Sequence, residues 1–238
     1  MRRGRLRWLT ERPIAHRGLH DLAAGRPENT IAAFRAAISH DYAIECDVHP
    51  AADGTPVVFH DDDLERLTGR RGSVRDCGVE ELARLPILGS SETVPTLDAL
   101  LAMVHGRVPL LVELKSVPGR DAGFAAAVAE RLKHYEGPVA AMSFEPDLIA
   151  GLRRAAPLLP RGLTAEGDYR SALRHLRTIL GGHVHFVSYA IDDLPTPAPL
   201  FARRVLGLPL VSWTIRAPDQ MEKARRWSDQ ITFEGFRP

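Results

Sequence analysis

The stretch Ile44-Glu45-Cys46-Asp47-Val48-His49 shows the pattern that decides the fold. It is short and apolar at every second position, which is typical of a β-strand. Successive side chains of a strand point to opposite faces, so Glu45 and Asp47 share one face. Cys46 and its apolar neighbours suit contact with a layer of helices on the other face. Both carboxylates are therefore expected to point into the interior of a barrel.

Short apolar runs alternate with amphipathic segments along the whole chain. Several runs are rich in Val or Ile without polar alternation, as expected of parallel strands that are covered on both faces. The predicted strands span residues 13–16, 43–49, 109–114, 138–142, 161–164, 184–189, 209–215 and 230–233. The predicted helices span residues 29–40, 120–135, 146–155, 169–180, 198–206 and 218–227. Eight strands alternating with helices favour a closed (β/α)8 TIM barrel over an open doubly wound sheet.

Residues 57–96 interrupt this alternation. They contain a predicted hairpin, an Arg- and Gly-rich turn at 68–72 and a loop with prolines. We interpret them as a small insertion after the second strand, near the mouth of the barrel. The 238 residues come close to the roughly 250 of a single α/β barrel, so residues 1–238 are expected to form one domain.

The charges of the chain are balanced, with 31 Lys and Arg against 30 Asp and Glu. A nucleic-acid-binding domain normally carries a basic excess, so the balance argues against a nucleic-acid partner. Glu11, Arg12 and Pro13 interrupt the basic start of the chain before an apolar segment develops. Neither secretion nor integral membrane association is therefore expected, and the first arginines are expected to form a solvated tail.

The two cysteines, Cys46 and Cys77, make neither a disulfide framework nor a CxxC pair for zinc. Cys46 lies inside an apolar run, where a buried free thiol is the common state. This usage fits a reducing compartment, and we expect a cytoplasmic protein.

Two carboxylates enclosed in a barrel repel each other, and burying either one without a partner is costly. Glu113, in the run Leu110-Leu111-Val112-Glu113-Leu114-Lys115, can join Glu45 and Asp47 from the next strand. Three carboxylates with open positions suit one divalent cation, Mg²⁺ or Ca²⁺, better than zinc. The alternative is that inward-facing Arg or Lys side chains balance the charge.

Lys115 repeats the spacing of two after Glu113, so it is expected beside the proposed cation. There its ammonium would hold an anionic oxygen of a substrate. The alternative is a Glu113–Lys115 ion pair that has no role in substrate binding.

His16 and His60 are the candidates for proton transfer. Each follows an apolar run, and His60 precedes three aspartates that could orient its imidazole. Two histidines near a carboxylate site favour general acid–base catalysis over a structural role. Arg17, next to His16, offers a guanidinium for bidentate contact with a phosphate or a carboxylate.

The segment Pro27-Glu28-Asn29-Thr30 opens the first predicted helix. Asn29 or Thr30 at this position is ordinary capping chemistry. A functional alternative has Glu28 and Asn29 projecting over the barrel mouth beside His16. The capping interpretation is favoured.

Taken together, these motifs resemble the glycerophosphodiester phosphodiesterase family. The longer matching motifs are His16-Arg17-Gly18, Pro27-Glu28-Asn29-Thr30, Glu45-Cys46-Asp47-Val48, Asp53-Gly54-Thr55-Pro56-Val57-Val58-Phe59-His60-Asp61 and Glu113-Leu114-Lys115. Shorter ones are Pro95-Thr96-Leu97, Ser143-Phe144 with Pro157, and Trp213-Thr214. The resemblance covers nearly the whole chain in the family's order. One departure is the C-terminal rim, where Ile231-Thr232-Phe233-Glu234-Gly235 replaces the family's common Thr-Asp or similar polar pair.

The resemblance implies a barrel with a small insertion after strand two. It implies a divalent metal held by Glu45, Asp47 and Glu113, with His16 and His60 as the acid–base pair. It further implies that Arg17 and Lys115 bind the phosphate and that Trp213 lines the pocket for the glycerol or alcohol part. Family members hydrolyse glycerophosphodiesters, which are small molecules, to glycerol 3-phosphate and an alcohol.

Two other functions stay open. A lipid phosphodiesterase resembling lysophospholipase D could use the same metal site, and an exposed apolar rim would favour it. A non-catalytic binding barrel would be expected to lack at least one of the proposed site residues, and none is missing from the sequence.

Overall fold

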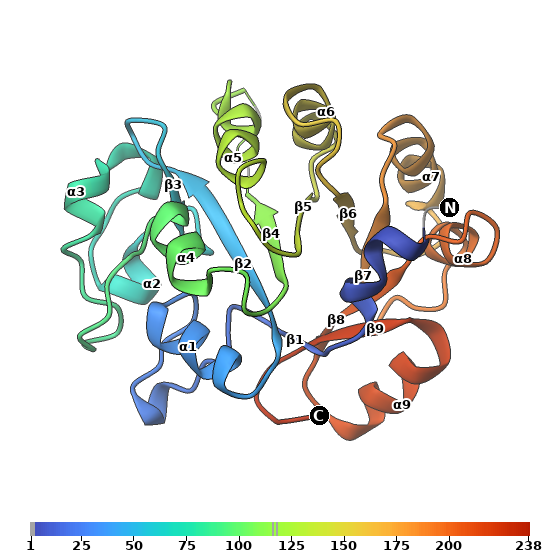
Figure 1. The fold of residues 1–238 in the computed structure, drawn as a ribbon, viewed down its shortest axis with the longest axis horizontal. Coiled ribbons are helices and arrows are strands. Elements are labelled where there is room, and N and C mark those ends of the chain that lie inside the picture. Colours follow the sequence, from blue (N-terminus) through green and yellow to red (C-terminus); the bar gives the residue numbers. More distant parts are fainter. Residues whose placement is uncertain (1–2, 116, 118) are drawn as a thin grey trace.

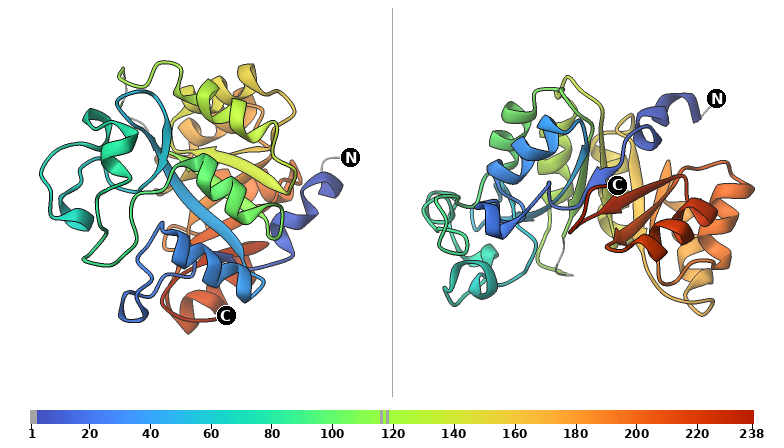
Figure 2. Two further views of the ribbon diagram at one scale, coloured as in Figure 1. Left: turned by 60° about the vertical axis from the view of Figure 1, so that its left-hand side comes forward. Right: turned by 90° about the horizontal axis from the view of Figure 1, so that it is seen from below.

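The computed structural model describes residues 3–115, 117 and 119–238. In this described part, eight parallel strands close into a barrel, because β1 pairs with both β2 and β9 (Figures 1 and 2). The barrel strands are β1 (Ile14–Ala15), β2 (Ala43–Pro50), β4 (Leu110–Leu114), β5 (Val139–Ser143), β6 (Arg161–Ala165), β7 (Phe186–Ala190), β8 (Leu210–Ile215) and β9 (Gln230–Phe233). The predicted (β/α)8 TIM barrel is confirmed, and each predicted strand is found within two residues of its expected start.

Helices surround the barrel and bury one face each against it (Figure 1). They are α1 (Ile31–Ser39), α4 (Leu97–Val104), α5 (Phe124–Leu132), α6 (Pro146–Ala155), α7 (Ala172–Gly181), α8 (Pro197–Arg204) and α9 (Pro218–Trp227). The sequence patterns missed α4. It is short and almost wholly apolar, so no polar face reveals a helical period. Its N-cap is Thr96, whose hydroxyl accepts a hydrogen bond from the N–H of Ala99.

The outer core lies between the strands and the helices. Cys46 faces it and is fully buried, as expected, with Val48 of the same strand beside it. Because neighbours on a strand alternate, this orientation turns Glu45 and Asp47 into the barrel.

A second core fills the half of the barrel interior nearer the amino ends of the strands, which we call the lower half; the upper half lies toward their carboxyl ends. It is apolar and consists of Leu6, Leu9, Ile14, Ala43, Leu111, Ala140, Met142, Phe186 and Val211. Leu6 and Leu9 come from a 3-10 helix, η1 (Arg3–Thr10), which precedes β1 and closes the amino end of the barrel. A solvated tail is expected for the first arginines: Arg7 is exposed, as expected, and the side chains of Arg2, Arg3 and Arg5 lie outside the described part of the chain. Leu9 of the same segment keeps only 1% of its surface accessible.

Between β2 and α4 the chain forms a small unit beside the barrel (Figure 1). Strand β3 (Pro56–Val58) pairs antiparallel with β2, and the short helices η3 (Val74–Asp76), α2 (Glu65–Thr68) and α3 (Val79–Leu82) follow it. The unit has its own apolar cluster, which includes Phe59, Leu64, Leu67, Val74 and Ile87. That residues 57–96 are an insertion in a single domain stays a prediction.

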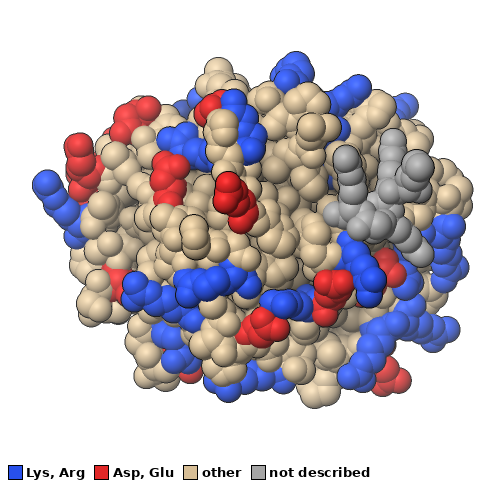
Figure 3. All heavy atoms as spheres, viewed as in Figure 1, with Lys and Arg blue, Asp and Glu red and all other residues tan. Residues whose placement is uncertain are grey.

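The surface shows no concentration of one charge on the face in Figure 3, where basic and acidic side chains are interspersed. Among the described residues, no helix has the length and apolar character needed to cross a membrane. The distribution of charge agrees with the balanced composition and gives no basic face in this view.

Candidate active site

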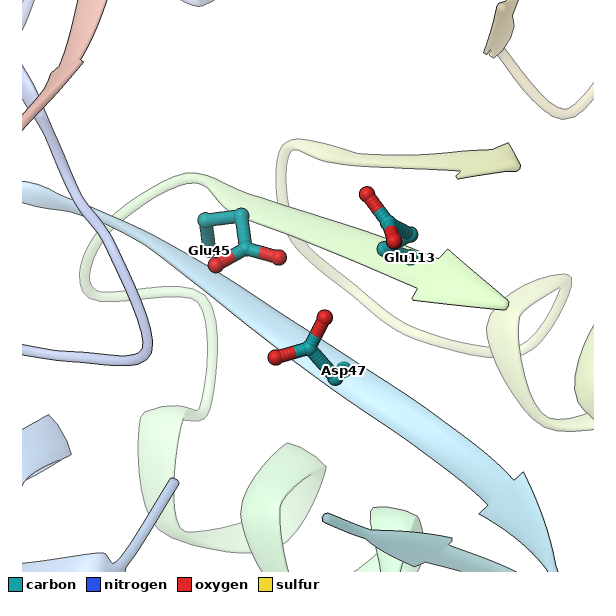
Figure 4. Close-up of side chains that lie close together, drawn as sticks. All are labelled: Glu45, Asp47 and Glu113. Carbon is teal, nitrogen blue, oxygen red and sulfur yellow. The ribbon is translucent and has the colours of Figure 1, made fainter. Parts of the chain in front are cut away.

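Three carboxylates converge inside the upper half of the barrel (Figure 4). Glu45 and Asp47 come from β2 and Glu113 comes from β4, where it is the register partner of Asp47. One oxygen of each lies within 4.8 Å of one oxygen of the others. All three residues are buried, and no more than 5% of the surface of any of them is exposed. The predicted alternation on the two strands therefore brings the three predicted metal ligands together.

The electrostatics of the three carboxylates differ. Burial raises the pKa of Glu45 well above its usual range, and the charges of Asp47 and Glu113 raise it further. Burial also raises the pKa of Glu113, and Lys115 offsets only part of that effect. For Asp47 the opposing charges of Lys115 and His60 outweigh burial and hold its pKa well below its usual range. The surroundings thus favour the ionised form of Asp47 and disfavour the charged forms of Glu45 and Glu113.

Lys115 faces this cluster from the end of β4. Its ammonium contacts Glu113 and lies 3.1 Å from Asp47 Oδ1. Burial alone would lower the pKa of Lys115, but the charges of Asp47 and Glu113 raise it, so the ammonium stays charged. The Glu113–Lys115 ion pair of the alternative interpretation is present, but Lys115 is shared with Asp47 and also lies over the Phe144 ring, 5.9 Å from its centre.

Arg17 follows β1 in a left-handed backbone conformation, with φ of 55°. Its backbone N–H donates to Glu45 Oε2 at 3.0 Å, and its guanidinium donates to Glu28 at 2.7 Å. The Nε of Arg17 lies 3.4 Å from Asp47 Oδ2. Gly18 completes the turn at φ of 79°, where a Cβ would stand 2.9 Å from the backbone of Ala33. This close approach explains the glycine after His16-Arg17.

The two predicted acid–base residues, His16 and His60, each have a carboxylate next to the ring nitrogen Nδ1. His16 Nδ1 lies 2.5 Å from Glu234 Oε2, and its Nε2 lies 3.9 Å from Glu45 Oε2. His60 Nδ1 lies 2.7 Å from Asp61 Oδ1. Burial lowers the pKa of His16 by more than the hydrogen bond with Glu234 raises it. A ring whose Nδ1 is held by a carboxylate has Nε2 free for proton transfer.

One cavity of about 180 Å³ joins these groups. It is lined by His16, Arg17, Glu45, Asp47, His60, Glu113, Lys115, Met142, Phe144, Ser188, Trp213, Thr214, Arg216 and Thr232. Every residue that the sequence proposed for the site is in this set. A larger cavity of about 540 Å³ lies between α5 and α6, but its walls bring together neither histidines nor lysines. The chemistry therefore marks the smaller cavity as the site.

The cavity has a neutral wall opposite the carboxylates, formed by β7, β8 and β9. Ser188 Oγ, Trp213 Nε1 and Thr232 Oγ1 are buried there without a hydrogen-bond partner among the described residues. The indole of Trp213 packs edge to face on Phe144, with ring centres 5.6 Å apart. Buried polar groups in proteins are normally satisfied, so these three are available to a polar ligand.

Asn29 contacts the site through Asp47, and the predicted capping role falls to Thr30 of the two candidates. It is fully buried, its amide donates to Asp47 Oδ2 at 2.9 Å, and its Oδ1 accepts from the N–H of Asp47 at 3.3 Å. Thr30 caps α1 instead, accepting from the N–H of Ala33. Two capping residues stand side by side in the sequence, and only one of them can occupy the cap.

Other supporting residues carry no local signal in the sequence. Arg66 donates to both Glu28 and Asp61, which ties the loop after β1 to the loop that carries His60. His49, at the end of β2, interacts through Nε2 with the carbonyl of His60 at 2.9 Å. Burial lowers the pKa of His49 to about 4, so its ring stays neutral in this role.

The barrel and the residues at its mouth define a phosphoric diester hydrolase. The chain belongs to the glycerophosphoryl diester phosphodiesterase family, whose sequence model matches residues 16–229. The glycerophosphodiester phosphodiesterase of Bacillus altitudinis is 34% identical over 177 residues, which cover 70% of this chain and 71% of that protein.

Solved structures show the same likeness. The crystal structure of the glycerophosphodiester phosphodiesterase from Thermotoga maritima matches with a TM-score of 0.76 and 26% identity, covering 92% of each chain. A phosphodiesterase from Oleispira antarctica, solved in complex with the product sn-glycerol-3-phosphate, has a TM-score of 0.81 at 24% identity and shows the same fold. This match covers 93% of the present chain and 91% of the other.

Proposed function

We propose that the protein hydrolyses glycerophosphodiesters to glycerol 3-phosphate and an alcohol, with a divalent cation, in the cavity at the barrel mouth. The observation that carries this proposal is the convergence of carboxylates, two cations and two carboxylate-held histidines on one cavity. Each of these groups answers one requirement of phosphodiester hydrolysis, namely charge neutralisation or proton transfer.

Glu45, Asp47 and Glu113 would hold the cation. Their oxygens suit Mg²⁺ or Ca²⁺, and a cation would offset both the burial and the mutual repulsion that raise the pKa of Glu45. When bound, such an ion supplies Lewis-acid stabilisation of phosphate oxygens. Asn29 would fix the orientation of Asp47 through its two hydrogen bonds.

Lys115 and Arg17 would bind the phosphate. The ammonium of Lys115 stays charged inside the site, and Arg17 Nε is buried without a hydrogen-bond partner among the described residues. Glu28 holds the other end of the Arg17 guanidinium, so this donor is preorganised. Preorganised donors stabilise the charge that develops in the transition state without further rearrangement.

His16 and His60 would move the protons. One imidazole takes the proton of the neighbouring glycerol hydroxyl as it attacks phosphorus, and the other protonates the departing alkoxide. Their Nε2 atoms would do so, because Glu234 and Asp61 occupy the Nδ1 positions. Water would then open the resulting cyclic phosphate to glycerol 3-phosphate. The neutral wall, with the Trp213 indole and two free hydroxyls, would receive the glycerol part.

A lipid phosphodiesterase on the same site is the second candidate. Phe144, which lines the cavity, has 37% of its surface exposed, and Tyr169 and Leu173, in the segment after β6, have 67% and 60% exposed. Trp8-Leu9, the other apolar stretch considered, does not support this candidate because Leu9 is buried in the lower core. The substrate panel below separates the two candidates.

We propose that the protein resides in a reducing compartment, namely the cytoplasm. Cys46 and Cys77 are both free and buried, which fits that environment. We also propose that the chain is a single barrel domain, with residues 57–96 as an insertion that supplies His60.

Release of glycerol 3-phosphate from a panel of glycerophosphodiesters tests the function, and release of the head-group alcohol from a second panel, of lysophospholipids, tests the lipid candidate. Each assay is run with Mg²⁺, with Ca²⁺ and with EDTA, on the wild type, Glu45→Gln and the exposed control Glu222→Gln. We expect cation-dependent release in the wild type and the control, and loss in Glu45→Gln. Full activity of metal-free protein in EDTA would reject the metal assignment, and cleavage of lysophospholipids alone would favour the lipid candidate.

A further inference from the structure

The C-terminal rim, which departs from the family pattern, meets the site through Glu234. This residue directly follows β9, and its Oε2 lies 2.5 Å from His16 Nδ1. Its Oε1 accepts from Nε of Arg216 at 2.6 Å, and His20 Nε2 lies 3.6 Å from Oε2. The carboxylate is mostly buried, with 18% of its side chain exposed. Glu234 is thus clamped between a rim arginine and a residue of the cavity.

The ionisation state of Glu234 determines which ring nitrogen of His16 carries the hydrogen. Although burial raises it, the hydrogen bonds with His16 and Arg216 and the proximity of His20 hold the pKa of Glu234 well below its usual range. An ionised carboxylate only accepts hydrogen bonds, so Nδ1 of His16 must carry the hydrogen. In a neutral imidazole the other nitrogen is then the acceptor, and Nε2 is the atom that faces Glu45.

We propose that Glu234 is the positioning residue of His16, and that it accepts the Nδ1 hydrogen bond and holds Nε2 toward the reacting phosphodiester. The proposal rests on the proposed function of the cavity. His60 offers a parallel, because Asp61 holds its Nδ1 in the same way. Asp61 is the next residue in the chain, whereas Glu234 is 218 residues away from His16.

The two oxygens of Glu234 separate this role from simple anchoring of the rim. Oε2 meets His16, and Oε1 meets Arg216. If anchoring were the role, removing the Arg216 contact would reproduce the effect of removing Glu234. If positioning is the role, the effect of Glu234 depends on His16 being present.

A double-mutant cycle with Glu234→Ala and His16→Ala is the test, with glycerol 3-phosphate release as the measured rate. In the wild-type background we expect Glu234→Ala to lower kcat by about 10- to 100-fold, the range seen when an orienting partner of a functional histidine is lost. KM should change little. In the His16→Ala background the same substitution should have no further effect. Equal losses in both backgrounds, or no loss in the wild type, would overturn the proposal.

Two further variants guard against a structural explanation. Glu234→Gln keeps an oxygen that can accept from Nδ1, so it should recover part of the turnover lost in Glu234→Ala. Arg216→Gln should lose less than Glu234→Ala, and a matching loss would assign the effect to anchoring of the rim. Thermal unfolding of each variant shows whether the fold persists.

A measurement without substrate keeps this proposal separate from the proposed function. Nitrogen-15 NMR of labelled histidines reports which ring nitrogen is protonated. We expect His16 to carry its hydrogen on Nδ1 in the wild type and to lose that preference in Glu234→Ala. An unchanged tautomer would reject the positioning role. Absence of glycerol 3-phosphate release from every substrate, with the tautomer shift present, would reject only the proposed function.

Discussion

The two halves of the barrel interior are built on the same strands and differ in almost every property. On β2 the inward residue changes from Ala43 in the lower half to Glu45 in the upper half. On β4 it changes from Leu111 to Glu113. A step of two residues along one strand thus separates a packing position from a position that can hold a metal. The comparison shows that residues which stabilise the fold and residues which form the site can be only two positions apart on one strand.

Burial contributes to the free energy of folding with opposite signs in the two halves. The lower half is apolar and closed by Leu6 and Leu9, so its burial favours folding. The upper half buries three carboxylates, and the raised pKa of Glu45 shows that the fold disfavours its charged form. Substitutions in the lower half should therefore affect stability, and those in the upper half should affect activity.

The largest effect is expected in the upper half. His60→Ala should lower kcat by about 10²- to 10⁴-fold, the usual contribution of a general acid or base. Its stability should change little, because 29% of the His60 side chain is exposed. Turnover and thermal unfolding are measured side by side, with the exposed His134→Ala as a control. Unchanged turnover with a large loss of stability would place His60 among the packing residues.

In the lower half, Leu9→Ala should reverse this pattern. Removing a buried leucine side chain should reduce the free energy of unfolding by about 2–5 kcal/mol. The folded fraction should keep its kcat, because Leu9 lies in the apolar core and not in the cavity. Denaturant unfolding gives the free energy, and Leu158→Ala, at a position that is 85% exposed, is the matched control. A fall in kcat without a fall in stability would break the division between the halves.

Glu45→Gln sharpens the comparison because its two effects should have opposite signs. In metal-free protein, it replaces a buried carboxyl group, whose charged form is disfavoured by burial and by the charges of Asp47 and Glu113, with a neutral amide. The free energy of unfolding should therefore rise, by on the order of 1 kcal/mol, while metal-dependent activity falls. Denaturant unfolding in EDTA measures the gain, against Glu222→Gln. A loss of stability in EDTA would show that the surroundings already balance the charge of Glu45.

The smallest effect concerns the rim of the upper half. Burial raises the pKa of Asp61, but hydrogen bonds with Arg66 and His60 lower it to about 2. A carboxyl group with a lowered pKa in the folded state stabilises the fold above its unfolded pKa, which is about 3.9. This contribution should be lost as the pH falls from about 4 to about 2.

The measurement is the difference in unfolding free energy between the wild type and Asp61→Asn across that pH range. Because the ion pair with Arg66 is partly exposed and screened, the difference above pH 5 should be at most about 1 kcal/mol. A difference that grows on acidification would contradict the sign of the shift.

The sequence predicts most of the barrel because strands covered on both faces leave unbroken apolar runs. It also predicts the charged residues of the cavity, since Glu45 or Lys115 in such a run has no ordinary packing explanation. The helix α4 escapes prediction because Asp98 is its only charged residue, which is too little to mark a polar face in so short a helix. Leu6 and Leu9 escape because arginines surround them in the chain.

The other features that the sequence does not predict are contacts between residues that are far apart in the chain. The position of Asn29 in the sequence is typical of a helix cap, and no neighbouring residue indicates that its amide donates to Asp47. Glu234 lies at the far end of the chain from His16, and only the closure of the barrel makes them neighbours. Sequence patterns report local periodicity, so contacts of this kind become visible only in the structure.

Barrel closure has a consequence for how the protein is made. Strand β1 pairs with β9, with Ile14 opposite Thr232, so a ribosome must deliver nearly the whole chain before the ring can shut. At about 5–20 residues per second, β1 waits on the order of 10–40 s for its second neighbour. Until then the growing sheet has open edges that can pair with other chains. The last strand to emerge also brings Glu234, so the nascent chain gains its closed ring and its complete His16 contact together.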